Sequence, residues 1–145
     1  MYLTVLLVDD YEPIRRMVCS MLEERNEFQV IGQAADGLQA IAKAEDLQPD
    51  LILLDIGLPK LSGIDAAPQI RKLAPKSKII FLTQNFSREI VEAALETGAH
   101  GYLVKSQAGQ ELFEALEAVI QGERFVSRSL RGLATGKVFR GEAGG

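Results

Sequence analysis

The sequence has very few of the residues on which several kinds of site depend. It holds one cysteine, Cys19, one histidine, His100, and no tryptophan. A single cysteine excludes an internal disulfide framework and a cysteine-cluster zinc site. A single histidine excludes a multi-histidine metal site and makes any serine–histidine triad depend on that one residue. We therefore expect both residues to be structural.

Long apolar runs and targeting signals are also missing. No apolar run approaches the ~20 residues that span a bilayer. The N-terminal run has no basic region before it and no small-residue cleavage site after it, and it leads straight into Asp9 and Asp10. These features predict a cytoplasmic location and no membrane partner.

The charge is unevenly distributed. The 145 residues include 16 basic and 20 acidic ones, for a net charge of −4, which disfavours nucleic-acid binding. After Gly122, five basic residues stand against two acidic ones, so this part carries +3 and residues 1–122 carry −7. We expect a folded domain over 1–122 and a linker-like tail over 123–145, disordered beyond about Thr135. The tail is too short for a helix-turn-helix, so no direct nucleic-acid contact is predicted from this chain.

Short apolar runs alternate with longer amphipathic stretches along residues 1–122. Five such pairs in order predict a doubly wound α/β domain with a five-stranded parallel sheet and right-handed crossovers. Met17, Leu38 and Ile120 each belong to the apolar stripe of a different expected helix, so all three are expected in the core. Pro68 should cost the third helix a hydrogen bond or delay its start. The strands are expected over 3–8, 28–35, 51–54, 78–83 and 101–104, and helices follow each of them.

Polar residues stand at the ends of the expected strands. Asp9 and Asp10 follow the first strand, Asp55 follows the third, Thr83 ends the fourth and Lys105 follows the fifth. The carboxyl ends of parallel strands meet at one edge, where such sheets bind ligands. Three crowded carboxylates repel one another unless a hard cation such as Mg²⁺ binds them. A carboxylate beside a metal can attack an activated phosphoryl group, and a lysine and a hydroxyl can stabilise its oxygens.

Four segments together resemble one known family. They are Leu6-Leu7-Val8-Asp9-Asp10, the loop 55–63 (DIGLPKLSG), Phe81-Leu82-Thr83 and the segment 98–105 (GAHGYLVK). Over about residues 3–122 the chain resembles a response-regulator receiver domain of two-component signalling. The resemblance implies a flavodoxin-like (βα)5 fold with strand order 2-1-3-4-5.

The resemblance also implies roles for the residues at the strand ends. Asp55 would accept a phosphoryl group from a sensor histidine kinase. Asp10, Asp55 and the backbone carbonyl of Gly57 would bind Mg²⁺, and Asp9 would hold a metal-bound water. Lys105 would pair with the phosphoryl oxygens. The domain would then be a phosphoacceptor that assists its own phosphorylation and dephosphorylation, rather than an enzyme with a separate substrate.

A switch is implied as well. Thr83 would move to hydrogen-bond the phosphoryl group, and Tyr102 would swing inward behind it, although a half-buried strand aromatic is an equally good interpretation of Tyr102. This movement would couple the site to the surface formed by the fourth helix, fifth strand and fifth helix. Phosphorylation-dependent homodimerisation is a further expectation.

The sequence departs from the family at two places near the site. Ser106 follows Lys105 where many relatives have proline, which leaves the peptide geometry there open. Gln84 follows Thr83 where a small residue is usual, and it should narrow access for small phosphodonors. Gly57 and Asn85 also flank the site and should influence access of water to the acyl phosphate.

Other functions remain alternatives. A haloacid-dehalogenase-type phosphohydrolase also uses an aspartate nucleophile, Mg²⁺ and lysine, but it normally needs a second aspartate where Gly57 stands. A degenerate receiver that acts only as a binding platform is disfavoured by the complete acidic set, and no glycine-rich nucleotide motif occurs. The chain further resembles NarL/FixJ-type receivers, so it is either a stand-alone receiver or part of a longer transcription factor; the linker-like tail favours the second.

Overall fold

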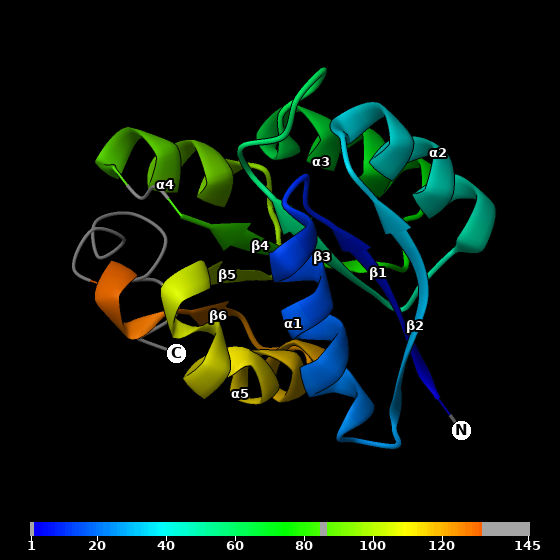
Figure 1. The fold of residues 1–145 in the computed structure, drawn as a ribbon. Helices are drawn as coiled ribbons and strands as arrows, with labels where there is room; N and C mark the ends of the chain where they lie inside the picture. Colours follow the sequence, from blue (N-terminus) through cyan, green and yellow to red (C-terminus); the bar gives the residue numbers. More distant parts are fainter. Residues whose placement is uncertain (1, 85–86, 132–145) are drawn as a thin grey trace.

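A computed structural model describes residues 2–84 and 87–131 of the chain as a three-layer α/β structure. Its sheet is parallel throughout, with the order β2-β1-β3-β4-β5-β6. In Figure 1, α1 and α5 cover one face, and α2, α3 and α4 cover the other. The strands are β1 (Leu3–Val8), β2 (Phe28–Ala34), β3 (Leu51–Asp55), β4 (Lys78–Thr83), β5 (Gly101–Val104) and β6 (Phe125–Val126). The helices are α1 (Glu12–Glu23), α2 (Gly37–Leu47), α3 (Gly63–Leu73), α4 (Arg88–Glu96) and α5 (Ala108–Ile120), with two short 3₁₀ turns, η1 (Lys105–Gln107) and η2 (Arg128–Leu130).

The predicted fold class and the strand order 2-1-3-4-5 are confirmed, but the sheet has six strands rather than five. The sixth, β6, pairs parallel to β5 through Phe125 opposite Gly101 and Val126 opposite Tyr102. A strand of two residues is too short to show alternation, so the sequence pattern gave no signal for it.

The central strands are buried on both faces, which explains their continuous apolar runs. Along β1, Leu6 and Val8 face the α2–α4 layer, whereas Val5 and Leu7 face the α1–α5 layer. All four side chains are fully buried. The alternation of strand side chains thus divides the core into two clusters that fix the sheet between its helices.

Local signals in the sequence mark the starts of several helices. Asp36 accepts a hydrogen bond from the Gln39 N–H at the start of α2, and Ser87 accepts one from the Ile90 N–H at the start of α4. Pro13 lies in the first turn of α1, where its missing N–H costs nothing. Pro68 lies inside α3 without delaying its start at Gly63, so its cost is the lost hydrogen bond.

Three residues expected in the core are exposed instead. Met17 is 37%, Leu38 56% and Ile120 38% exposed. Helical spacing locates the centre of an apolar stripe but not its margins, and Leu38 lies in the first turn of its helix. Cys19 is half-buried against the α1–α5 cluster, and burial raises the pKa of its thiol.

The segment after Gly122 is packed against the sheet as far as Leu130. Phe125, Val126 and Leu130 are buried, and the Phe125 N–H donates to the His100 carbonyl. The domain boundary after Gly122 stays a prediction, and the disorder expected beyond Thr135 falls outside the described residues. Across residues 2–84 and 87–131, the helices are too short and too polar to include a membrane span.

Candidate functional site

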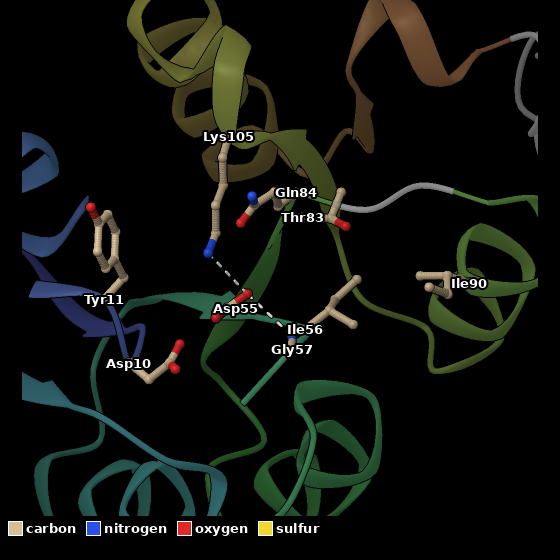
Figure 2. Close-up of a pocket in the computed structure, with 9 residues that line it drawn as sticks. All are labelled: Asp10, Tyr11, Asp55, Ile56, Gly57, Thr83, Gln84, Ile90 and Lys105. Atoms are coloured by element: carbon tan, nitrogen blue, oxygen red, sulfur yellow. Dashed lines mark hydrogen bonds and ion pairs between the residues drawn. The ribbon is translucent and has the colours of Figure 1, made fainter. Parts of the chain in front are cut away.

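The predicted residues at the strand ends surround a pocket at the carboxyl edge of the sheet. Its volume is about 880 Å³. Figure 2 shows the Asp55 side chain at its centre, with Lys105 reaching toward it from above. Residues that line it include Asp10, Asp55, Gly57, Thr83, Gln84 and Lys105. Four of the five residues in the strand-end argument, Asp10, Asp55, Thr83 and Lys105, therefore line one pocket.

Lys105 links the two buried carboxylates of the site. Its Nζ lies 2.7 Å from Asp9 Oδ2 and 3.2 Å from Asp55 Oδ1. Asp9 is fully buried beneath the pocket, and Asp55 is 4% exposed. One ammonium thus faces two carboxylates in a region shielded from water, where charge interactions are strong.

Backbone N–H groups hold both carboxylates in place. The Gly57 N–H donates to Asp55 Oδ1 over 3.2 Å, and the Tyr11 N–H donates to Asp9 Oδ1 over 2.9 Å. Both contacts come from the residue two positions further along the chain, so each loop orients the carboxylate at the end of its own strand. The loops after β1 and β3 therefore orient the two carboxylates, and Lys105 links them.

The pKa values of the pair follow from burial and charge. Burial raises the pKa of Asp55, and the charge of Asp9 raises it further, against the opposing effect of Lys105. Burial alone lowers the pKa of Lys105, but its hydrogen bond to Asp9 and the charges of both carboxylates outweigh this, so the pKa rises. Lys105 therefore stays protonated, and the site retains uncompensated negative charge.

The acidic residues fit a hard divalent cation. Asp9, Asp10 and Asp55 each offer a carboxylate oxygen, and these oxygens lie within 4.8 Å of one another. Asp10 is exposed and lines the pocket mouth, so a cation can reach it from solvent. Several carboxylate oxygens beside open space for water are the donors that Mg²⁺ prefers. The predicted role of the Gly57 carbonyl as a further ligand stays a prediction.

Thr83 and Tyr102 lie at different depths. Thr83 ends β4, is 3% exposed and lines the pocket. Tyr102 lies deeper, with its ring centroid 5.6 Å from that of Phe81. Tyr102 is 1% exposed, and burial raises its pKa against the smaller opposing effect of a hydrogen bond with the Thr97 side chain.

Sequence reasoning missed three residues that line the pocket, Tyr11, Ile56 and Ile90. Tyr11 directly follows the acidic pair, a position that itself signals the rim, whereas Ile90 comes from α4 and carries no signal in the sequence (Figure 2). Gln84 does line the pocket, as expected, while Asn85 lies outside the described residues. The described part of the chain contains no cis peptide bond, so Lys105–Ser106 is trans.

His100 is held by the backbone rather than by any site. Its Nδ1 accepts a hydrogen bond from the Ile79 N–H over 3.1 Å, and the backbone N–H of His100 donates to the Ile79 carbonyl. It lies at the start of β5, at the opposite end of the strand from Lys105. This agrees with the structural role expected for the single histidine.

A doubly wound parallel sheet with this acidic pocket and lysine at its carboxyl edge defines a flavodoxin-like domain suited to binding a cation and a phosphoryl group. The sequence profile of the response regulator receiver domain matches residues 5–117. The chain belongs to this family. It is thus a signalling domain of two-component systems, and the phosphohydrolase alternative is set aside.

Individual relatives agree with the assignment. The chain is 36% identical over 123 residues to the response regulator protein VraR of Staphylococcus aureus, covering 85% of this chain and 59% of that relative. A two-component response regulator of the LuxR family from Aurantimonas sp. SI85-9A1 is 30% identical with a TM-score of 0.85, over 91% of this chain and 94% of that one. The isolated REC domain of RcsB from Salmonella enterica serovar Typhimurium, in the presence of phosphomimetic BeF₃⁻, is 26% identical with a TM-score of 0.84, over 92% and 99%.

Proposed function

We propose that Asp55 accepts a phosphoryl group from the phosphohistidine of a sensor histidine kinase in a Mg²⁺-dependent reaction. The observation that carries this proposal is the pairing of Lys105 with the buried Asp9 and Asp55 beneath a pocket that Asp10 lines. A carboxylate held in this way is oriented and shielded, yet it faces an opening wide enough for a donor.

The chemical step is a displacement at phosphorus. An Asp55 carboxylate oxygen attacks, an O–P bond forms, and the P–N bond to the imidazole breaks with its electron pair leaving on nitrogen. Asp55 Oδ1 is held by Lys105 and the Gly57 N–H, so we assign the attack to Oδ2. The Lys105 ammonium and the Thr83 hydroxyl then stabilise the transferred oxygens. The residues assigned to Mg²⁺ are Asp10, Asp55 and the Gly57 carbonyl, with Asp9 acting through a water. The bound ion supplies positive charge against the developing phosphoryl oxygens.

Tyr102 serves in this proposal as the second position of the switch. Its ring occupies an inward, buried place. Movement of Thr83 toward the phosphoryl group favours the inward position and reshapes the α4–β5–α5 surface.

The output that we propose is transcription, through a DNA-binding domain on the same or a separate chain, with phosphorylation promoting a homodimer. The support is similarity to a LuxR-family regulator and the fact that the chain spans 59% of the length of VraR. A stand-alone receiver that acts on a protein partner is the alternative.

Intact mass spectrometry tests the phosphoacceptor. The protein is incubated with Mg²⁺ and acetyl phosphate, beside Asp55→Asn and the exposed control Asp65→Asn. We expect one labile phosphoryl group on the wild type and on Asp65→Asn, and none on Asp55→Asn or without Mg²⁺. Equal labelling of Asp55→Asn would contradict the proposal. If Gln84 excludes the small donor, a Mg²⁺-dependent rise in melting temperature with beryllofluoride replaces the mass gain.

A further inference from the structure

The segment 125–130, which we call the C-terminal latch, is tied to the end of β5 by a buried polar network. The Ser127 hydroxyl accepts a hydrogen bond from the Val104 N–H over 2.9 Å and donates one to Glu111 Oε1 over 2.6 Å. Ser127 is fully buried and Glu111 is 3% exposed. Val104 directly precedes Lys105, so the network ends one residue from the lysine of the site.

The other oxygen of Glu111 is also paired. Glu111 Oε2 accepts hydrogen bonds from the backbone N–H and the guanidinium of Arg128, both over 3.3 Å. Burial of a carboxylate costs free energy unless the group is hydrogen-bonded, and these contacts both offset that cost and fix the orientation of the Glu111 side chain. Glu111 on α5 thereby holds Ser127 in one orientation.

A second contact ties the latch to the turn that begins with Lys105. The Ser129 hydroxyl donates to Gln107 Oε1 over 3.0 Å, and Gln107 ends η1. In addition, the Ser127 N–H donates to the Tyr102 carbonyl over 2.9 Å. The latch therefore contacts the chain on both sides of Lys105.

We propose that Ser127, held by Glu111, is a positioning residue for phosphoryl transfer. It fixes the end of β5 and so places the Lys105 ammonium against Asp55. This inference rests on the proposed function, since it concerns the reaction of Asp55. The physical reason is that Lys105 must reach two carboxylates at once, and a misplacement of about 1 Å can cost on the order of 100-fold in rate.

The positioning role has a reciprocal consequence. If the closed latch favours the Lys105 position that binds the phosphoryl group, then a phosphoryl group on Asp55 favours the closed latch to the same extent. Phosphorylation should therefore slow the opening of residues 125–130. The latch would carry the signal from the site toward the part of the chain that follows it.

The first test compares Ser127→Ala with Ser77→Ala. Ser77, which directly precedes β4, is also buried. Its hydroxyl donates to the Pro49 carbonyl, at the opposite edge of the sheet from Lys105. Both variants should lose stability. Ser127→Ala should in addition be phosphorylated about tenfold more slowly by acetyl phosphate with Mg²⁺, because the end of β5 no longer holds Lys105 against Asp55. Ser127→Thr, which keeps the hydroxyl, should recover the rate.

The second test follows hydrogen exchange with and without beryllofluoride and Mg²⁺. In the wild type and in Ser77→Ala, the amides of Ser127 and Arg128 should exchange more slowly when the phosphoryl mimic is bound. In Ser127→Ala the mimic should leave their exchange unchanged. Should Ser127→Ala fail to fold, both measurements are repeated on Glu111→Gln. The glutamine oxygen can still accept from the Ser127 hydroxyl, but the –NH₂ group in place of Oε2 cannot accept from the Arg128 N–H.

Two results would overturn the positioning role while leaving the phosphoacceptor intact: a rate for Ser127→Ala equal to that of Ser77→Ala, or labelling of wild-type Asp55 with no change in exchange at the latch. A wild type that takes up neither a phosphoryl group nor beryllofluoride would overturn the proposed function and the positioning role together.

Discussion

At the scale of residues, the site holds more carboxylates than ammonium groups. Asp9 and Asp55 share the single ammonium of Lys105, and Asp10 adds a third carboxylate within 4.8 Å. Under the proposed function, a bound Mg²⁺ would offset this excess negative charge, so the stability of the domain should depend on Mg²⁺.

Substitution of Asp10 separates these two effects. Asp10→Asn removes both a like charge and a cation ligand. Without metal it should raise the free energy of unfolding by up to about 1 kcal/mol, since Asp10 is exposed and its repulsion is screened. Addition of Mg²⁺ should stabilise the wild type but not the variant. Thermal melts with and without Mg²⁺ measure both, and an equal Mg²⁺ response in the two proteins would contradict the metal assignment.

His100 makes a second contribution at this scale, through pH. Burial lowers the pKa of His100 from 6.5 to about 4, and the charges of Lys78, Arg71 and Arg124 add to the effect. The neutral ring is the form that fits, because Nδ1 accepts the Ile79 N–H. Between these two pKa values the unfolded chain binds a proton that the folded domain does not.

The stability due to this histidine is therefore complete above pH 6.5 and is lost as pH falls toward 4. His100→Asn keeps a hydrogen-bond acceptor but does not titrate. Between pH 7.5 and about pH 5, the wild type should lose roughly 2 kcal/mol more unfolding free energy than the variant. Urea denaturation at the two pH values measures the difference, and parallel losses would show that His100 is protonated freely in the folded state.

At the scale of elements, the β3–α3 loop must approach the site closely. A side-chain carbon on Gly63 would overlap the carbonyl oxygen of Asp55, so glycine lets the start of α3 pack directly on the end of β3. Ser62 caps the helix at the same point by accepting from the Asp65 N–H. The position of the Asp55 backbone thus depends on the helix that follows it.

Gly63→Ala should disturb stability and reaction together. It should cost about 2–3 kcal/mol through overpacking and should slow phosphorylation, because the displaced atom belongs to Asp55. Gly109→Ala in α5 is the matched control, since nothing lies within 4 Å of its added carbon. It should instead gain about 0.5–1 kcal/mol. Unfolding curves and labelling rates of both variants decide this, and a Gly63→Ala protein of wild-type stability and rate would refute the close packing.

The elements also show what sequence can predict. β4 was predicted over 78–83, where it is observed, because a run buried on both faces has sharp ends. The strand-end argument placed Asp9, Asp55 and Lys105 together for the same reason. By contrast, Ile90 reaches the pocket from α4, and tertiary packing determines the burial of Tyr102. Neither placement depends on a local sequence pattern, so neither could be predicted before the fold was known.

At the scale of the whole molecule, residues that follow the predicted boundary at Gly122 pack against the core. Phe125 packs in the α1–α5 cluster, and Val126 and Leu130 pack in the α2–α4 cluster, so the segment closes both layers of the core at the β5 edge. Its sequence resembles a linker because it is short and basic, yet Phe125, Val126 and Leu130 are buried. Burial of this kind is set by the partner surface and leaves no periodic signal.

A chain that ends after Gly122 should therefore be much less stable than one that ends after Arg131. Loss of three buried apolar side chains should lower the unfolding free energy on the order of 5 kcal/mol. Denaturant titration of the two chains measures this. Equal midpoints and slopes would support the predicted boundary at Gly122 and would leave the latch without a role in stability.

The central claim is that Asp55 is the phosphoacceptor, and one measurement tests it most directly. The protein is treated with Mg²⁺ and a phosphodonor, preferably a phosphorylated histidine kinase, and then with borohydride, which reduces an aspartyl phosphate to homoserine. Peptide mass spectrometry then identifies the residue that was phosphorylated. We predict homoserine at position 55, dependent on Mg²⁺ and absent from Lys105→Ala at short times. Homoserine at position 9 or 10, or phosphate retained on a histidine or serine, would contradict the account.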